Sequence, residues 1–435
     1  MKVVARGGSG LVGIVRRLGW GVGDQAVSSA SNFVLGVVVA RSLGPEGFGA
    51  FSLAYLTYAF VLNATRGVAT DPLVVRFSAA PTEAWRRAVA ASTATAAAIG
   101  LLAGVVCVVV GLALPATLSG GFVALGVALP ALMLQDSWRF AFFAAGRPAQ
   151  AFLNDLVWTV LLIGALLVLA VTDRAGVVSC VLTFGGTAAL AAAFGFLQCR
   201  IRPRPSWVRA WLTDHRALGG RYLIENVSIG GARQLRFFAL GALAGLAAVG
   251  HVRAAEILMG PFLVLLMGVS QVAVPEAAQV VARAPRRLLL FCLALGGVQA
   301  VTAAAWLVLV LLVVPDALGS GVLGPIWYPA VALLPIVGLG MSIGGFEIGA
   351  AAGVRALGAA PRSLVAQLAN ASFYVVLGIT GAWLGGARGS CWGVVIATAL
   401  GTVVWWVQLH RALGEHLDDL ARADVPALRP EGITT

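Results

Sequence analysis

The sequence predicts an all-α polytopic membrane protein of about twelve transmembrane helices, organised as two halves of six. Hydrophobic residues make up 60% of the chain and charged residues only 11%, with a mean hydropathy of +0.93. A soluble domain carries roughly 25% charged residues, so this much apolar surface needs the bilayer as its solvent. Apolar segments and basic connections also alternate regularly along the chain. Composition, segment length and charge alternation therefore predict the same fold class.

A spanning helix needs about 20 mostly apolar residues. Segments of this kind lie near 19–40, 48–69, 88–112, 122–144, 149–171, 176–197, 219–240, 250–273, 288–314, 329–352, 363–384 and 391–411. Turn-forming and charged residues separate them, for example at Gly44-Pro45 and Pro315-Asp316. We therefore expect twelve crossings joined by short connections.

The distribution of basic residues predicts how the chain is oriented. Alternate connections, counted from the N-terminus, hold 23 of the 30 Lys and Arg residues. The other set holds only Arg41, Arg174, Arg253 and Arg388. Cytoplasmic connections of membrane proteins are enriched in Lys and Arg. We therefore expect a multi-pass protein of the cytoplasmic (inner or plasma) membrane with both termini in the cytoplasm.

The longest internal connection divides the chain into two halves. We predict an N-terminal six-helix bundle over 1–197, a basic connector over 198–218, a C-terminal six-helix bundle over 219–412 and a cytoplasmic tail over 413–435. The connector places Trp207, Trp211 and Leu218 among arginines, a pattern typical of a short helix lying in the membrane interface. Both halves begin on the same side, as in parallel repeats.

Several function classes do not fit the sequence. The net charge of +12 would suggest nucleic acid in a soluble protein, but here topology explains it. Lys2 is the only lysine, so the chain has no Walker A lysine and we expect no ATP hydrolysis by that route. The scattered cysteines and histidines show no metal-ligand spacing, and no removable signal peptide is expected.

Ionisable residues inside the predicted spans are the candidate functional residues, because an unpaired charge in lipid is costly. The acidic candidates are Asp24, Asp136, Glu225 and Glu347, and the basic candidates are Arg66, Arg139, Arg233 and Arg236. Asn32 lies on the same helical stripe as Asp24. The stripes of the first and seventh spans would meet across a central cavity. The alternative interpretation is structural: Asp136 and Arg139, spaced i, i+3, would pair with each other.

Residues 23–33 read GDQAVSSASNF and residues 40–49 read ARSLGPEGFG. This stretch resembles the first helix and first loop of polysaccharide-type flippases of the multidrug/oligosaccharidyl-lipid/polysaccharide (MOP) exporter superfamily, which export O-antigen and teichoic-acid-like precursors. The resemblance implies a V-shaped pair of six-helix bundles around a central cavity, with alternating access. Lipid II flippases of the superfamily carry two further helices that this chain lacks, whereas its drug exporters also have twelve spans.

The resemblance and the buried arginines together suggest an anionic amphiphile as the substrate. Guanidinium groups bind phosphate in a bidentate manner, and a polyprenyl diphosphate is anionic where lipid meets sugar. We expect Arg233 and Arg236 to contact this anion, with Glu347 or Asp136 as the protein alternative. No cofactor is expected apart from a coupling H⁺ or Na⁺ on the acidic groups. The expected partners are membrane lipid, the lipid-linked glycan and the glycosyltransferases or polymerase of its pathway, with no nucleic acid.

Three other functions remain open at this level. A cation-coupled exporter of drugs or metabolites would use the same fold, although intramembrane arginines would repel a cationic substrate. A polyprenyl-dependent glycosyltransferase would need a catalytic carboxylate group on a sizeable loop, and all outward loops here are short. A purely structural membrane scaffold is the last alternative. We therefore expect a transporter and no enzyme.

Overall fold

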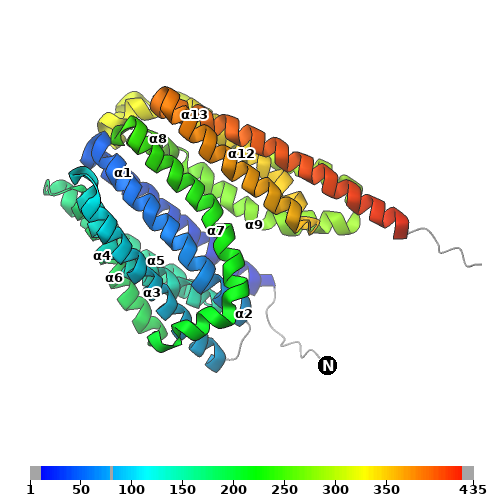
Figure 1. Ribbon diagram of the computed structural model, residues 1–435, viewed down its shortest axis with the longest axis horizontal. Helices are drawn as coiled ribbons and strands as arrows, with labels where there is room; N and C mark the ends of the chain where they lie inside the picture. Colours follow the sequence, from blue (N-terminus) through cyan, green and yellow to red (C-terminus); the bar gives the residue numbers. More distant parts are fainter. Residues whose placement is uncertain (1–10, 79–81, 424–435) are drawn as a thin grey trace, which may run out of the picture.

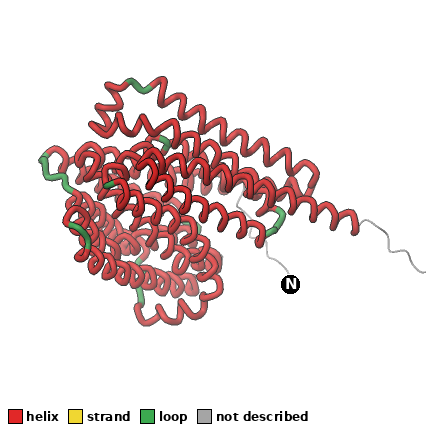
Figure 2. Tube along the Cα trace, turned by 45° about the horizontal axis from the view of Figure 1, so that its top comes forward, coloured by secondary structure: helices red, strands yellow, loops and turns green. Residues whose placement is uncertain are grey.

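The computed structural model describes residues 11–78 and 82–423, except for the side chains of residues 11–26, 28, 225, 229, 264–272, 421 and 423. Within these residues the chain is helical and contains no strand. Figure 2 shows the helices joined by short loops. The predicted all-α fold class is confirmed.

The first half contains six α-helices and one π-helix. These are α1 (Leu11–Thr65), η1 (the π-helix, Arg66–Thr70), α2 (Asp71–Phe77), α3 (Thr82–Ala113), α4 (Ala116–Ala144), α5 (Pro148–Val171) and α6 (Val177–Cys199). The second half contains η2 (Pro205–Trp207), α7 (Val208–Ala244), α8 (Leu246–Leu258), α9 (Gly260–Arg283), η3 (Pro285–Arg287), α10 (Leu288–Val313), α11 (Asp316–Leu323), η4 (Gly324–Ile326), α12 (Trp327–Ala356) and α13 (Ala360–Ala423).

Two of the helices contain two crossings each. In α1 the backbone leaves the helical conformation at Gly44, where φ is 65°, just before Pro45. In α13 the backbone leaves the helical conformation at Gly385 and Gly386, and the φ of Gly386 is 55°. Glycine adopts positive φ without steric cost, so these residues permit the sharp turns. Eight helical stretches are long and apolar enough to span a membrane. The two broken stretches each cover two predicted spans, and α7 and α8–α9 correspond to the remaining two.

The two halves share a core at one end of the molecule and have separate cores at the other. We call the end with the connections at residues 78–82, 144–148 and 199–208 the basic side, and the end with Gly44, Gly245 and Gly386 the opposite side. The largest hydrophobic cluster joins residues of both halves, for example Phe48 with Val249 and Leu53 with Phe237. Toward the basic side, one cluster belongs to α2–α7 and another to α9–α13. Figure 1 shows the two sets of ribbons side by side near α8 and diverging toward α2 and the end of α13.

Contact between α1 and α8 on the opposite side is backbone to backbone. A Cβ at Gly49 would lie 1.9 Å from the carbonyl oxygen of Leu246, and one at Gly250 would lie 2.3 Å from that of Pro45. No residue larger than glycine fits at either position without moving the helices apart. Arg41 also donates to the carbonyl of Gly321 from the other half. The halves are therefore in direct contact at this side.

The predicted connector is partly continuous with the seventh span. A short turn at Pro205–Trp207 leads into α7, which runs from Val208 to Ala244. The residues expected to form a separate short helix are thus the first turns of α7. The predicted tail begins inside α13, which continues to Ala423, and its remaining residues lie outside the described part.

Candidate functional site: a cavity in the second half and a polar network in the first

A cavity of about 500 Å³ lies between α7, α8, α9, α12 and α13. Its walls are mostly apolar, with polar groups from Arg233, Arg236, Glu256, Glu347 and Asn370. Among the residues whose side chains are described, all that line the cavity come from the second half of the chain. The sequence predicted a cavity lined jointly by the first and seventh spans. In the structure the first span packs against α8, for example Gly36 against Ile257, whereas the side chains of residues 11–26 and 28 lie outside the described part.

Glu256 in α8 is the centre of an arginine cluster. Arg253 Nη1 lies 2.8 Å from its carboxylate, Arg236 Nη1 lies 3.8 Å away, and Arg233 of α7 also donates to it. The sequence had suggested a mobile anion, Glu347 or Asp136 as the partner of Arg233 and Arg236. Glu256 was missed, although it lies within the predicted span 250–273 and its burial was visible there.

Arg233 and Arg236 differ in exposure. The Arg233 side chain is 42% exposed, whereas that of Arg236 is 2% exposed. Arg236 donates to the Tyr374 hydroxyl at 2.7 Å and to Ser390 Oγ at 3.0 Å, both on α13. One carboxylate faces three guanidinium groups, so the cluster keeps an excess of positive charge. Arg233 is the member of this cluster that an incoming anion would reach first.

Glu347 lies toward the other end of the same cavity. Its carboxylate oxygens accept bonds from Asn370 Nδ2 at 3.0 and 3.2 Å. In the described part of the chain no arginine lies within ion-pair distance of Glu347. The cavity thus has an arginine-rich end and an end with a carboxylate bound to an amide.

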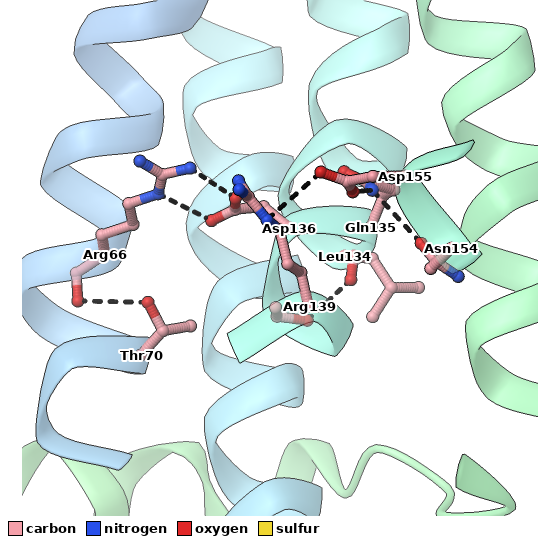
Figure 3. Close-up of polar contacts among 9 residues, drawn as sticks. Arg66, Thr70, Leu134, Gln135, Asp136, Arg139, Asn154 and Asp155 are labelled. Atoms are coloured by element: carbon pink, nitrogen blue, oxygen red, sulfur yellow. Dashed lines mark hydrogen bonds and ion pairs between the residues drawn. The ribbon is translucent and has the colours of Figure 1, made fainter. Parts of the chain in front are cut away.

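The first half holds a separate polar network (Figure 3). Arg66 binds Asp136 through two bonds of 2.6 and 3.0 Å. Arg139 Nε lies 3.2 Å from Asp155 of α5, which also accepts from Gln135 at 3.0 Å. Asp136 and Arg139 therefore pair across helices and not with each other.

Three sequence-predicted candidates remain: Asn32, Asp24 and Glu225. Asn32 accepts a bond from the Tyr55 hydroxyl at 3.0 Å, within α1. Asp24 and Glu225 are in α1 and α7, but their side chains lie outside the described part. Asp155 was missed by the sequence, although it follows the first turn of the predicted span 149–171 and was visible there as a buried carboxylate.

Several solved structures have the same fold. The chain aligns with an inward-facing multidrug resistance MATE family transporter of the MOP superfamily at a TM-score of 0.71 and 16% identity, covering 91% of this chain and 96% of that one. An outward-facing MATE transporter gives a TM-score of 0.58 at 15% identity over 93% and 96%. A MOP superfamily transporter from Pyrococcus furiosus, described by the reverse polarity of its binding pocket, gives 0.55 at 15% identity over 93% and 96%.

No protein-family model matches the chain, and no curated protein matches it. At these identities the similarity establishes the fold: two bundles, twelve helices and no strand in the described residues.

Proposed function

We propose that this protein is an alternating-access transporter that moves an anionic amphiphile, a polyprenyl-diphosphate-linked oligosaccharide, across the cytoplasmic membrane. Both termini and the connector 198–218 face the cytoplasm in this proposal, and the protein acts as a transporter, without enzymatic activity.

The observation that carries the proposal is the positive excess of the arginine cluster, of which Arg233, Arg236 and Glu256 line the cavity. Arg233, Arg236 and Arg253 surround the single carboxylate of Glu256. Charges in an apolar surrounding need compensation, and one carboxylate compensates one guanidinium. A diphosphate entering the cavity would supply the missing negative charge. Arg233 offers it the planar donor fork that suits phosphate.

The apolar walls of the cavity suit the lipid portion of such a substrate. Mostly apolar walls with a few convergent polar groups are typical of sites for small amphiphilic ligands. The solved neighbours support transport as the activity, because those proteins are transporters seen in inward- and outward-facing conformations. The P. furiosus protein is described as having a different function linked to its pocket polarity, which supports charge as the feature that separates substrates on this fold.

Energy for transport would come from an ion gradient and not from ATP. Glu347 is the best placed group for a coupling H⁺ or Na⁺, because it is bound to Asn370 and is not held in an ion pair in the described part of the chain. Protonation or cation binding would neutralise it without disturbing the arginine cluster at the other end.

The second candidate is a cation-coupled exporter of drugs or metabolites. It is favoured by the size of the cavity and by the multidrug transporters among the solved neighbours. The two functions differ in the charge of the substrate, since the arginine cluster attracts an anion and repels a cation.

The first prediction tests the arginines. The double variant Arg233→Gln/Arg236→Gln should lose nearly all export of the lipid-linked glycan, because the cavity no longer attracts the diphosphate. Arg233→Lys should keep partial export, since the charge remains but the bidentate fork is lost. The measurement is complementation of glycan export at matched expression.

Arg221→Gln is the matched control, because it removes an exposed arginine from the same helix. It should export normally. Full glycan export by the double variant would overturn the proposal. Resistance to drugs conferred by the wild-type protein, together with unchanged glycan export, would instead support the second candidate.

A further inference from the structure

Four arginines gather at the end of α6 on the basic side, away from the cavity. Arg86 belongs to the first turn of α3, Arg147 precedes α5, and Arg200 and Arg204 follow α6. All four are exposed. In the described part of the chain none of them forms an ion pair, and the nearby Glu83 is engaged by Arg87 at 3.2 Å. This cluster therefore carries uncompensated positive charge.

The cluster is held by the backbone of three elements. Arg204 N donates to Ala90 O at 2.9 Å, which ties the connector to α3. An Arg86 guanidinium nitrogen lies 3.3 Å from the carbonyl of Arg200 and donates to it. Arg200 ends α6 with φ of 53°, which turns the connector back toward α3. Gln198 Nε2 near the end of α6 donates to Gln150 O at 3.5 Å, and Gln150 N donates to Arg147 O at 3.0 Å, which brings the start of α5 to the same end of α6.

An apolar, outward-facing row on α6 leads to this point. Leu182, Leu190 and Leu197 lie on one face of the helix, and Leu190 and Leu197 are 58% and 65% exposed. Such a row in a membrane helix faces lipid chains. Beyond its last leucine come Arg200 and Arg204, and the guanidinium of Arg204 lies 4.9 Å from the ring centre of Trp207. Tryptophan and arginine are typical of the headgroup level of a bilayer.

We propose that Arg86, Arg147, Arg200 and Arg204 form a binding site for the phosphate of one anionic phospholipid, whose acyl chain lies along the leucine row of α6. The site is separate from the transport cavity, so it does not depend on the function proposed above. An acyl chain that lies along the leucine row ends at the four arginines. The phosphate therefore comes from a membrane lipid and not from solution.

The general tendency of membrane proteins to place basic residues on one side does not account for this arrangement. That tendency concerns the number of Lys and Arg residues in a connection. It requires neither convergence from three elements nor the absence of a neighbouring carboxylate. A site for one lipid phosphate requires arginines from several elements to lie together, and it requires that no neighbouring carboxylate compete with the phosphate.

The test is native mass spectrometry of the full chain released from vesicles of equal phosphatidylglycerol and phosphatidylcholine. Retained phosphatidylglycerol should exceed phosphatidylcholine in the wild-type protein. The variant Arg86→Gln/Arg147→Gln/Arg204→Gln should lose at least about tenfold of this preference, because it removes the charge-assisted hydrogen bonds that hold one phosphate. The variant that carries lysine at the same three positions should keep most of it.

The matched control is Arg283→Gln/Arg286→Gln/Arg287→Gln, which removes the same charge from exposed arginines on the same side of the other half. It should change the preference less than twofold. Equal losses in both triple variants would show general surface charge and would overturn the site. Displacement of phosphatidylglycerol by inorganic phosphate at millimolar concentration would also overturn it, in favour of a free-anion site. Melting temperatures of all variants in phosphatidylcholine, where no anionic lipid is present, show that each is folded.

Discussion

The buried charged side chains of the first half are paired between different helices. Arg66 reaches from η1 to Asp136 on α4, and Arg139 of α4 reaches Asp155 on α5. Figure 3 shows these groups in one layer between the helices. Removing one member of a buried pair leaves the other charge without compensation, which costs more than removing both.

This leads to a prediction at the residue scale. Asp136→Asn or Arg66→Gln alone should destabilise the protein by about 3–5 kcal/mol, and the double variant by less than the sum. The measurement is the free energy of unfolding of the purified protein in mixed micelles. The pair of Arg87 with Glu83 is the control, because both side chains are about 70% exposed and their removal should have little effect. Additive effects at Arg66 and Asp136 would contradict the ion pair.

The sequence identified most of these charges but not their partners. Burial of Asp136, Arg233 and Arg236 follows from their place inside apolar segments. Pairing depends on how helices far apart in the chain are rotated against each other, which local sequence does not determine. For that reason the i, i+3 pair of Asp136 and Arg139 was a reasonable expectation, yet each residue faces a different helix.

At the scale of elements, α7 connects the two halves. Toward the basic side Trp211 Nε1 donates to Val68 O at 3.2 Å, and Asn226 Nδ2 lies 3.1 Å from Asp71 Oδ2. Toward the opposite side Arg236 binds α13. Gly230 and Gly231 lie between these two regions. The helix contacts the first half along its length, since Gln234 also donates to Thr57 Oγ1 at 2.7 Å, whereas its bonds to α13 lie only beyond Gly231.

A second prediction concerns these glycines. If α7 bends there during transport, Gly230→Ala/Gly231→Ala should slow transport several-fold while stability is kept or raised, since alanine favours helix by about 1 kcal/mol per residue. A Cβ at either position meets Phe60 at 3.4 Å or more, so the variant should fold. Transport rate and melting temperature are measured together.

Gly220→Ala is the matched control, because it changes the same helix where no atom lies within 4 Å. It should leave the rate unchanged. Equal slowing by the control variant, or normal transport by the double variant, would exclude bending at Gly230 and Gly231.

The helical segments can be predicted from the sequence, whereas the turns and the π-helix within them can be predicted only in part. The turns at Gly44 and Gly385 are visible as glycine- and proline-containing separators. The π-helix at Arg66–Thr70 is not, because it depends on tertiary partners: Trp211 bonds the carbonyl of Val68 and Ser92 that of Ala69. A π-helix alters the regular hydrogen bonding of a helix and is frequent at functional sites.

At the scale of the whole molecule, the charge of each connection predicts the side of the membrane that it faces. Because 23 of 30 basic residues lie on alternate connections, we predict that Ser206 and Ser320 lie on opposite sides of the membrane, with Ser206 in the cytoplasm. Cysteine introduced at Ser320 should react with an impermeant maleimide in intact cells, and cysteine at Ser206 only after permeabilisation. Reaction of both in intact cells would contradict the topology.

The two-half plan was predictable at this scale, but the place of the cavity was not. Six spans per half follow from counting apolar segments. The described lining of the cavity comes from the second half, and the glycine contacts that join α1 to α8 become visible only when both helices are placed.

Those glycine contacts have an electrical consequence. A channel for water needs room for at least one molecule, of the order of 10–15 Å³. At Gly49 and Gly250 there is no room even for a methyl group, so no file of water molecules can pass between α1 and α8 there. Protons move rapidly along such files. The contact therefore closes this route between the two halves to protons on the opposite side of the molecule.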